Sequence, residues 1–283
     1  MPFMNHLALS AMGSVLRSRC NMLAKDCVQP LLRVRGVSKS YGGRAALQDA
    51  SFDLWPGEVM AVVGESGSGK TTLLQAIAAR NCPDMGVVEF LSRERQLQDV
   101  YRMSQARQRL LSRTDWGFVH QNAADGLRMD VSAGANIGER LMGLGERHYG
   151  HLRQTAQEWL ERVEIDPLRI DDTPRTFSGG MRQRLQIARN LVTSPRLVFM
   201  DEPTSGLDVS VQARLLDLLR QLTRQMQLAV VIVTHDLAVA RLLAQRMMVM
   251  QKGRVVESGL TDQVLDDPQH PYTQLLVSSV LHP

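Results

Sequence analysis

Short, uninterrupted apolar runs alternate along the chain with longer stretches in which apolar residues recur every three or four positions. The short runs, rich in β-branched residues, predict buried strands, and the wider spacing predicts helices with one apolar face. Strands are expected on this basis at residues 58–63, 116–121, 197–202 and 229–234. Helices are expected at residues 72–79 and 182–192. This succession of strands and helices predicts an α/β fold.

The region before the first buried strand has a different pattern. Residues 31–37 suit an edge strand, and residues 51–54 alternate apolar and polar side chains. A turn at residues 55–58 then leads into the strand at 58–63, because Pro56 and Gly57 favour turns.

The middle of the chain breaks the strand rhythm. Residues 93–111 are polar, rich in arginine and spaced as a helix. A second apolar face with helical spacing consists of Leu152, Ala156, Trp159 or Leu160, and Val163. These patterns predict a helical insertion at about residues 92–175, between two halves of an α/β sheet. The arginines of the first stretch, which are Arg102, Arg107, Arg109 and Arg113, are expected to form a solvated face.

Composition places the chain among soluble globular proteins. Its 283 residues, 44% apolar and 22% charged, suit one large domain or a domain with an insertion. The net charge of +4 is small and aromatic residues are few, so a solvated surface is favoured over a nucleic-acid site. No apolar run approaches the roughly 20 residues that cross a bilayer, so direct membrane insertion is not expected.

The cysteines and the first thirty residues bear on location. Cys20, Cys27 and Cys82 show no metal-binding or C-x-x-C spacing, which indicates reduced thiols and a cytoplasmic protein. Arg17 follows the apolar run of residues 7–16, whereas a secretory signal carries its positive charges before that run. Residues 1–30 are therefore expected to be a disordered extension, or the product of a start codon placed too early, with Met22 as one alternative start.

The most informative motif lies between the strand at 58–63 and the helix at 72–79. Residues 64–71 fit the pattern G-x-x-x-x-G-K-[ST], a loop that wraps the phosphates of a nucleotide. Its glycines allow a sharp turn that points backbone N–H groups inward, and the following helix start also favours an anion. Lys70 supplies a charge near the β- and γ-phosphates, and the Thr71 hydroxyl can ligate Mg²⁺. The expected nucleotide-binding residues here are Gly64, Glu65, Ser66, Gly67, Ser68, Gly69, Lys70, Thr71 and Thr72.

Polar residues end the other buried strands. Asp201 and Glu202 follow one strand, where the first carboxylate fits a Mg²⁺ holder and the second a general base for water. Gln121 ends a second strand and could reach Mg²⁺ and the attacking water. His235 follows a third strand, at the edge where α/β sheets bind ligands.

Two further features have weaker signals when taken alone. Ser178, Gly179 and Gly180 form a helix start with a natural N-cap and uncovered backbone N–H groups, which is a second anion site or simply a cap. Tyr41, beside a turn at residues 42–43, could stack on an adenine ring or pack as an ordinary loop tyrosine.

With these motifs in this order, residues 31–283 resemble an ATP-binding-cassette (ABC) ATPase. The resemblance implies a P-loop fold with a RecA-like core, an antiparallel β subdomain and a helical subdomain at about 92–175. It also implies ATP and Mg²⁺ as ligands, with Tyr41 stacking on adenine. Phe177 and Met181 depart from the commonest form of the family's signature, although neither change touches the backbone donors of residues 178–180.

The same resemblance implies a dimer, either of this chain with itself or with a related cassette. Two cassettes would pair head to tail, so that Lys70 and Thr71 of one copy face Ser178 and Gly180 of the other across the γ-phosphate. Glu202 would polarise the attacking water, and Gln121 would contact that water and Mg²⁺. His235 would hold the γ-phosphate.

A narrower resemblance concerns the partner. Residues 266–276 are similar to ATPases of oligopeptide and nickel importers, which would make the chain the motor of a permease. The segments 122–142 and 177–217, with the last fifty residues, look like the ABC subunit of the bacterial carbon–phosphorus (C–P) lyase system. That system degrades phosphonates with a soluble core complex, which would then be the partner. A soluble ABC protein acting on nucleic acid or ribosomes is a third alternative, disfavoured because the chain has one cassette and a short insertion.

Overall fold

The computed structural model describes residues 29–281, of which residues 31 onward belong to one compact unit. The predictions for residues 1–30, including the alternative start at Met22 and the thiols of Cys20 and Cys27, lie almost wholly outside the described residues. In the described part of the chain, no helix is both long and apolar enough to cross a membrane.

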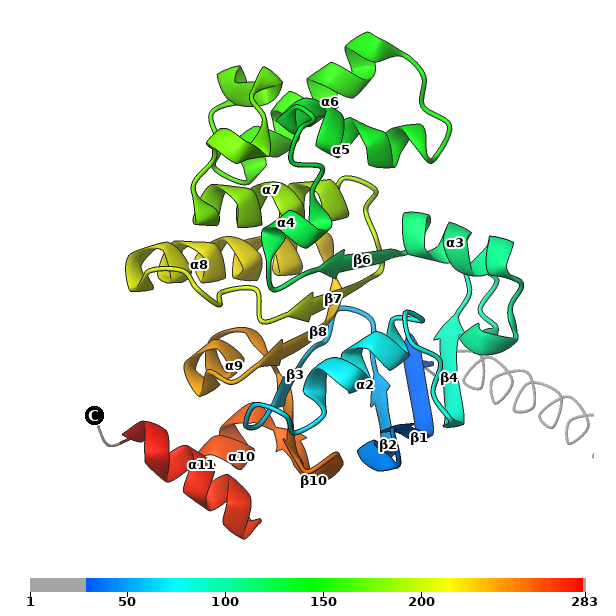
Figure 1. The fold of residues 1–283 in the computed structure, drawn as a ribbon, viewed down its shortest axis with the longest axis vertical. Coiled ribbons are helices and arrows are strands. Elements are labelled where there is room, and N and C mark those ends of the chain that lie inside the picture. Colours follow the sequence, from blue (N-terminus) through cyan, green and yellow to red (C-terminus); the bar gives the residue numbers. More distant parts are fainter. Residues whose placement is uncertain (1–28, 282–283) are drawn as a thin grey trace, which may run out of the picture. The chain divides into compact units, whose positions relative to one another are not determined.

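Two sheets form the framework of this unit (Figure 1). The first sheet is antiparallel, with the strand order β2-β1-β4-β5. Its strands are β1 (Leu32–Tyr41), β2 (Arg44–Leu54), β4 (Met85–Leu91) and β5 (Leu97–Asp99).

The second sheet has six strands in the order β10-β9-β3-β8-β7-β6. All neighbours are parallel except β10, which runs antiparallel to β9. Its strands are β3 (Val59–Val63), β6 (Trp116–Val119), β7 (Leu197–Asp201), β8 (Ala229–Thr234), β9 (Arg246–Gln251) and β10 (Arg254–Leu260). The four buried strands expected from the apolar runs are therefore confirmed as β3, β6, β7 and β8.

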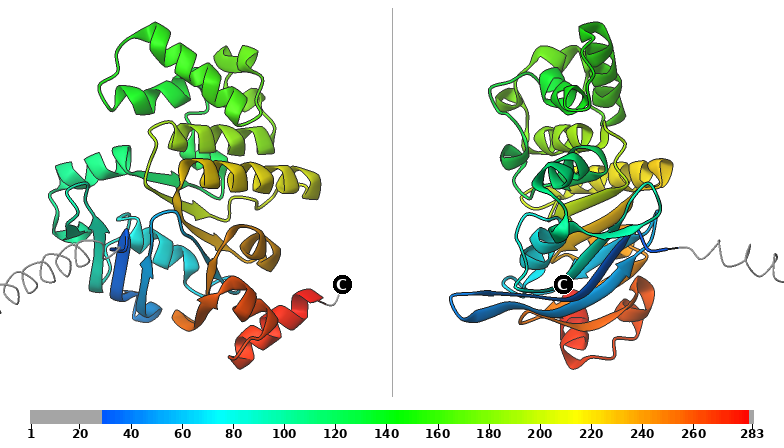
Figure 2. Two further views of the ribbon diagram at one scale, coloured as in Figure 1. Left: turned by 180° about the vertical axis from the view of Figure 1, so that it is seen from behind. Right: turned by 90° about the vertical axis from the view of Figure 1, so that its right-hand side faces the viewer.

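Helices cover both faces of the six-stranded sheet (Figures 1 and 2). The helices of the unit are α2 (Lys70–Ile77), α3 (Gln105–Thr114), α4 (Ala123–Gly126), α5 (Ala133–Met142), α6 (Tyr149–Arg162), α7 (Gly179–Leu191), α8 (Val209–Met226), α9 (Leu237–Leu243), α10 (Thr261–Asp266) and α11 (Pro271–Leu281). Short 3₁₀ turns lie at Val100–Arg102, Pro167–Asp171 and Pro174–Thr176. This mixture of sheets and helices confirms the α/β prediction.

The alternation of side chains along β3 divides the core into two clusters. Ala61 and Val63 point into the cluster that contains α7, α8 and α9. Met60 and Val62 point into the cluster that α2 shares with both sheets. All these residues are fully buried, which a strand with helices on both faces requires.

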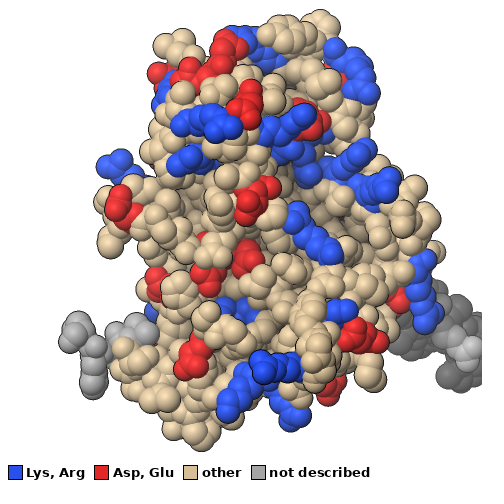
Figure 3. Space-filling view, viewed as in Figure 1, with Lys and Arg blue, Asp and Glu red and all other residues tan. Residues whose placement is uncertain are grey.

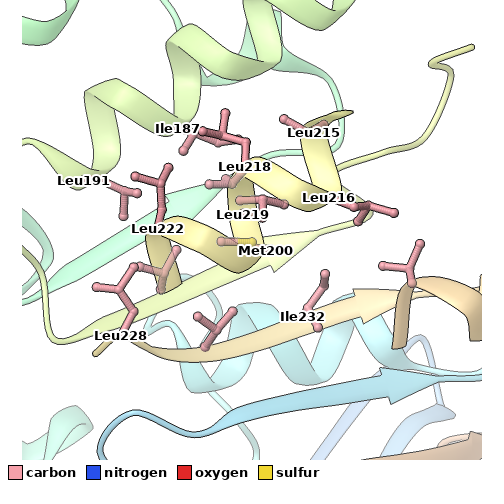
Figure 4. Close-up of a cluster of buried hydrophobic side chains, with 14 of the residues drawn as sticks. Ile187, Leu191, Met200, Leu215, Leu216, Leu218, Leu219, Leu222, Leu228 and Ile232 are labelled. Carbon is pink, nitrogen blue, oxygen red and sulfur yellow. The ribbon is translucent and has the colours of Figure 1, made fainter. Parts of the chain in front are cut away.

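Helix α8 shows how the larger cluster is built (Figure 4). Its buried leucines recur three or four positions apart and meet Ile187 and Leu191 of α7 on one side and Met200 and Ile232 of the sheet on the other. The buried leucines of α8 are Leu215, Leu216, Leu218, Leu219 and Leu222. Burying each such side chain contributes roughly 1.5–3 kcal/mol. The core thus fixes α7 and the ends of β7 and β8, which carry candidate site residues.

The predicted helix over residues 93–111 is wrong in its first half. Leu97–Asp99 is the short strand β5, which pairs with β4 through a tight turn where Arg95 has a left-handed backbone (φ 60°). Helix α3 begins only at Gln105, capped by the Ser104 side chain. Strand β6 also lies within 92–175, so the expected lower bound of the helical insertion, near residue 92, is too early. After β6, the run of helices begins with α4, at Ala123.

The charged surface is mixed rather than one-sided. Figure 3 shows Lys and Arg side chains interspersed with Asp and Glu side chains over the face that it presents. Many are paired, such as Arg175 with Asp130 at 2.6 Å and Arg153 with Asp171 at 2.6 Å. The four arginines expected to form a solvated face are indeed exposed.

Candidate functional site

The carboxyl ends of four parallel strands bring the expected site residues to one edge of the sheet. Gly64 follows β3, Gln121 lies two residues after the end of β6, Asp201 ends β7, and His235 follows β8. The strands are direct neighbours, with Val63 opposite Thr234 and Asp201 opposite Val233. The open edge of a parallel sheet is where such folds bind ligands.

The loop between β3 and α2 needs glycine at two close approaches. A Cβ atom on Gly64 (φ 148°) would lie 2.2 Å from the carbonyl oxygen of Met250, and one on Gly69 (φ 102°) would lie 2.4 Å from that of Ala46. These contacts are with backbone atoms, which cannot move aside easily. The loop is therefore held tightly against the ends of β9 and β2, and any side chain at either position would push it away.

The same loop presents uncovered N–H groups. Gly69 is the N-cap of α2 and makes no side-chain cap, so the first turn of the helix keeps free donors. Ser66 and Gly67 are exposed, and in the described part of the chain no acceptor is found for their backbone N–H groups. Free donors at the positive end of a helix make an anion site. The predicted phosphate loop is thus built as such a site requires.

Lys70 is buried inside this loop. Its Nζ atom donates hydrogen bonds to the carbonyl oxygens of Gly64 at 2.7 Å and Glu65 at 2.8 Å. Burial lowers the pKa of Lys70, although the nearby carboxylates of Glu202 and Asp201 oppose that shift. A buried ammonium group with only carbonyl partners is ready to exchange them for a phosphate oxygen, whose charge would stabilise it.

Thr71 and Asp201 place two oxygen ligands side by side. The Thr71 hydroxyl donates to Oδ1 of Asp201 at 3.3 Å. Burial raises the pKa of Asp201, and the hydrogen bond from Thr71 works against that rise. A hydroxyl and a carboxylate this close together fit Mg²⁺, which prefers oxygen and takes its other ligands from water and phosphate. Gln121, the third expected ligand, contacts Glu202 and Ser205. In the described residues, no group of three or more His, Cys, Asp or Glu side chains is arranged to hold a metal ion.

Glu202 is held by two of the other expected residues. Its Oε2 atom lies 3.2 Å from Nδ1 of His235 and accepts a hydrogen bond from Nε2 of Gln121 at 3.4 Å. The Glu202 backbone is left-handed (φ 42°), which strains a non-glycine residue by about 1 kcal/mol or more. Hydrogen bonds from Glu202 N–H to Val233 and from Ser205 N–H to Glu202 hold this turn. The geometry brings together a carboxylate, an amide and an imidazole where a water molecule could be activated.

The start of α7 faces outward. The Ser178 hydroxyl accepts from the Met181 N–H at 3.3 Å, which confirms Ser178 as the N-cap. Ser178 and Gly179 are exposed, whereas Gly180 is buried, and a Cβ atom there would lie 2.4 Å from Val211. In the described part of the chain, residues 178–180 make no hydrogen bond to the loop at 64–72. The exposed start of α7 is therefore accessible from solvent.

Tyr41 stands at the end of β1, 48% exposed. Its hydroxyl contacts the Asn81 side chain, which follows α2, and Nζ of Lys39 lies 5.8 Å from the centre of its ring. Within the described residues no hydrogen bond links Tyr41 to the phosphate loop. Its exposed ring is free to stack on a base, and that role stays a proposal.

Three contacts at the site are not predicted by the sequence. Ser205 receives a hydrogen bond from Gln121 at 3.2 Å. Gln186 of α7 makes two hydrogen bonds to the backbone of His120, the residue before Gln121. It accepts from the His120 N–H at 2.5 Å and donates to the His120 carbonyl at 3.2 Å. The Tyr272 hydroxyl of α11 accepts from the Glu65 N–H at 3.0 Å. Local patterns carry no signal for these pairs, since each joins residues 66 or more positions apart.

Comparison with protein families gives two matches. Residues 47–205 match the family model described as ABC transporter. Residues 256–283 match a second model, described as the C-terminal region of oligopeptide/dipeptide transporters.

Curated relatives fall into two groups. The putative phosphonates utilization ATP-binding protein PhnK of Escherichia coli (strain K12) is 67% identical over 253 residues, which cover 89% of this chain and 98% of that protein. A putative peptide import ATP-binding protein of Brucella ovis is 37% identical over 260 residues, covering 90% of this chain and 80% of the relative. The di/tripeptide transport ATP-binding protein DppF of Pseudomonas aeruginosa is 35% identical over 264 residues, with 93% and 80% covered.

Solved structures with the same fold include two ABC cassettes. cbiO1 from Clostridium perfringens, part of an ABC transporter complex, superposes with a TM-score of 0.73 at 26% identity, covering 84% of this chain and 91% of that one. The cassette MJ0796, a dimer bound to ADP and Pi in a post-hydrolysis state, gives a TM-score of 0.72 at 28% identity, with 81% and 98% covered.

Proposed function

The chain belongs to the ABC transporter family of ATP-binding ATPases, and from this premise we propose that it hydrolyses ATP with Mg²⁺ in a head-to-tail dimer that serves phosphonate breakdown. The exposed start of α7 is the observation that supports a dimer. One copy offers Lys70 and the loop donors on one side of the terminal phosphate, and among the described residues its own Ser178 makes no hydrogen bond to that loop. A second copy, or a related cassette, supplies the missing donors.

Each residue of the sheet edge then has a task. The loop N–H groups and Lys70 bind the β- and γ-phosphates, and Thr71 with Asp201 would hold Mg²⁺, which neutralises phosphate charge when bound. Glu202 accepts a proton from the attacking water, and Gln121 orients that water. His235, beside Glu202, donates to the γ-phosphate, and the exposed ring of Tyr41 stacks on adenine.

The partner is proposed from the relatives. The 67% identity to PhnK over nearly its whole length supports the C–P lyase system, against 35–37% for peptide import ATPases. We place the contact with a lyase core subunit at the segment after Gln121. There α4 is capped by the Asn122 side chain, and Asp125 and Arg128 are exposed. This role requires a cytoplasmic protein.

An importer motor is the second candidate, because residues 256–283 match the C-terminal region of oligopeptide/dipeptide transporters. The two candidates differ in what binds the exposed segment. A permease would hold the ATPase at a membrane, whereas a lyase core complex would bind it in solution.

Affinity purification of the tagged chain from cells grown on a phosphonate separates the two. We expect C–P lyase subunits to co-purify, and Asp125→Arg to reduce their yield at least tenfold with ATP affinity unchanged. Asp262→Arg, an exposed substitution on α10, is the matched control and should leave the yield intact. Recovery of membrane permeases without lyase subunits would replace the first candidate by the second.

A further inference from the structure

The C-terminal helix reaches the phosphate loop through one hydroxyl group. Tyr272 lies in the first turn of α11, more than two hundred residues from the loop, and its hydroxyl oxygen accepts a hydrogen bond from the Glu65 N–H at 3.0 Å. We propose that Tyr272 is a positioning residue for nucleotide binding, which holds the phosphate loop in its binding conformation from outside.

Glu65 is the point at which the loop is fixed. Its carbonyl oxygen accepts from Nζ of Lys70 at 2.8 Å and from the Ser68 N–H at 3.1 Å. Its N–H donates to Tyr272, so both backbone polar groups of Glu65 are hydrogen-bonded. Releasing the N–H would let Glu65 turn, and the Lys70 ammonium and the neighbouring loop donors would turn with it.

The Tyr272 hydroxyl is itself held in place. The ring is 7% exposed and belongs to the larger core cluster. The Glu257 carboxylate of β10 accepts from the N–H groups of Gln269 at 2.8 Å and His270 at 3.0 Å. His270 Nδ1 in turn accepts from the Tyr272 N–H at 3.1 Å. The start of α11 is thus fixed to β10. Because the Tyr272 hydroxyl is already held in place, little further conformational entropy is lost there when the loop binds a ligand.

The geometry leaves the ligand-facing donors free. Tyr272 takes the Glu65 N–H, whereas the uncovered donors are those of Ser66, Gly67 and the first turn of α2. A second outside contact, from the Gly253 N–H to the Ser68 carbonyl at 2.9 Å, holds the far side of the loop. The C-terminal part of the chain therefore supports the loop at two points without occupying its phosphate-binding face.

The test is Tyr272→Phe in the full chain, which removes the hydroxyl and keeps the buried ring. One hydrogen bond is worth a factor of about two to ten in an equilibrium constant. We expect the Kd for ATP and for ADP to rise about three- to tenfold, while kcat at saturating ATP changes less than twofold. The unfolding midpoint without nucleotide should fall by no more than about 2–4 °C, as the loss of one hydrogen bond implies. Tyr149→Phe, an exposed tyrosine on α6, is the matched control and should change none of these values.

A double-mutant cycle separates positioning from packing. Glu65→Pro removes the N–H that donates to Tyr272. In the Glu65→Pro background, Tyr272→Phe should leave nucleotide affinity unchanged. A Kd unaltered by Tyr272→Phe alone, or the same loss in both backgrounds, would overturn the proposal.

Discussion

Glu202 combines two properties that its proposed task as general base requires. Its carboxylate is partly buried at the end of β7 yet within reach of His235 and Gln121. Its left-handed backbone aims the side chain away from the course of the strand, and neighbouring backbone hydrogen bonds offset that strain. A variant whose side chain at position 202 has the same shape but no basic oxygen should therefore bind nucleotide normally and fail to hydrolyse it.

Glu202→Gln tests this assignment. Because glutamine cannot accept the proton of the attacking water, ATP turnover should fall at least about a hundredfold. Nucleotide affinity should stay within about twofold, and the ATP-bound dimer should accumulate. Turnover by phosphate release and mass by light scattering measure the two effects. Turnover at the wild-type rate would remove Glu202 from its role.

Lys70→Ala tests the proposed contact between the phosphate loop and the nucleotide. Loss of a charge-assisted contact to phosphate costs about 1.5–3 kcal/mol, so the Kd for ATP should rise roughly ten- to a hundredfold. Burial lowers the pKa of Lys70, so removing the desolvated charge should leave the nucleotide-free protein as stable as the wild type, or more stable. Titration calorimetry gives the affinity and thermal unfolding gives the stability. An unchanged Kd would exclude a phosphate contact.

At the scale of elements, the sequence predicts those strands and helix caps whose signals lie within a few neighbouring residues. Apolar runs marked β3, β6, β7 and β8, and the residues that follow them had to meet at one edge because the strands are parallel and adjacent. Ser178 was recognisable as a cap from its place before a helical repeat. Strand β5 was missed because its three residues, Leu97–Asp99, include only one apolar side chain and lie beside an arginine-rich stretch. Its pairing with β4 depends on the turn between them.

The link between α7 and β6 could not be predicted for a related reason. Gln186 and His120 are 66 residues apart, and a glutamine inside a helix is usually a solvated side chain. Here Gln186 is fully buried and satisfies both backbone groups of His120. Only the packing of α7 against the sheet places these groups together.

Gln186→Leu measures the strength of this link. Leucine fits the buried volume but leaves the His120 N–H without its partner, whereas the His120 carbonyl keeps a hydrogen bond from Nε2 of Gln183 at 3.2 Å. The free energy of unfolding should therefore fall by about 1–3 kcal/mol. Because Gln121 follows His120, ATP turnover should fall as well. Gln154→Leu, on the exposed face of α6, is the control. Urea unfolding that shows equal stability for both variants would contradict the structural importance of the link.

At the scale of the whole molecule, one copy holds two halves of different sites. In the proposed mechanism the sheet edge binds the nucleotide through the loop after β3, and the exposed start of α7 offers backbone donors to the other copy. In the proposed head-to-tail dimer, each half would lie opposite its complement, and ATP would become part of the interface. The dimer should therefore depend on ATP and should use residues from both copies at every site.

The most direct test mixes two inactive variants, both in the Glu202→Gln background that retains ATP. Lys70→Ala and Ser178→Arg alone should each remain monomeric with ATP in sedimentation experiments, because both sites of either homodimer are damaged. In an equal mixture, one of the two sites combines an intact Lys70 with an intact Ser178, so ATP-dependent dimers should reappear. A mixture that stays monomeric, or a Ser178→Arg variant that dimerises like its parent, would contradict a phosphate held from both sides by two copies.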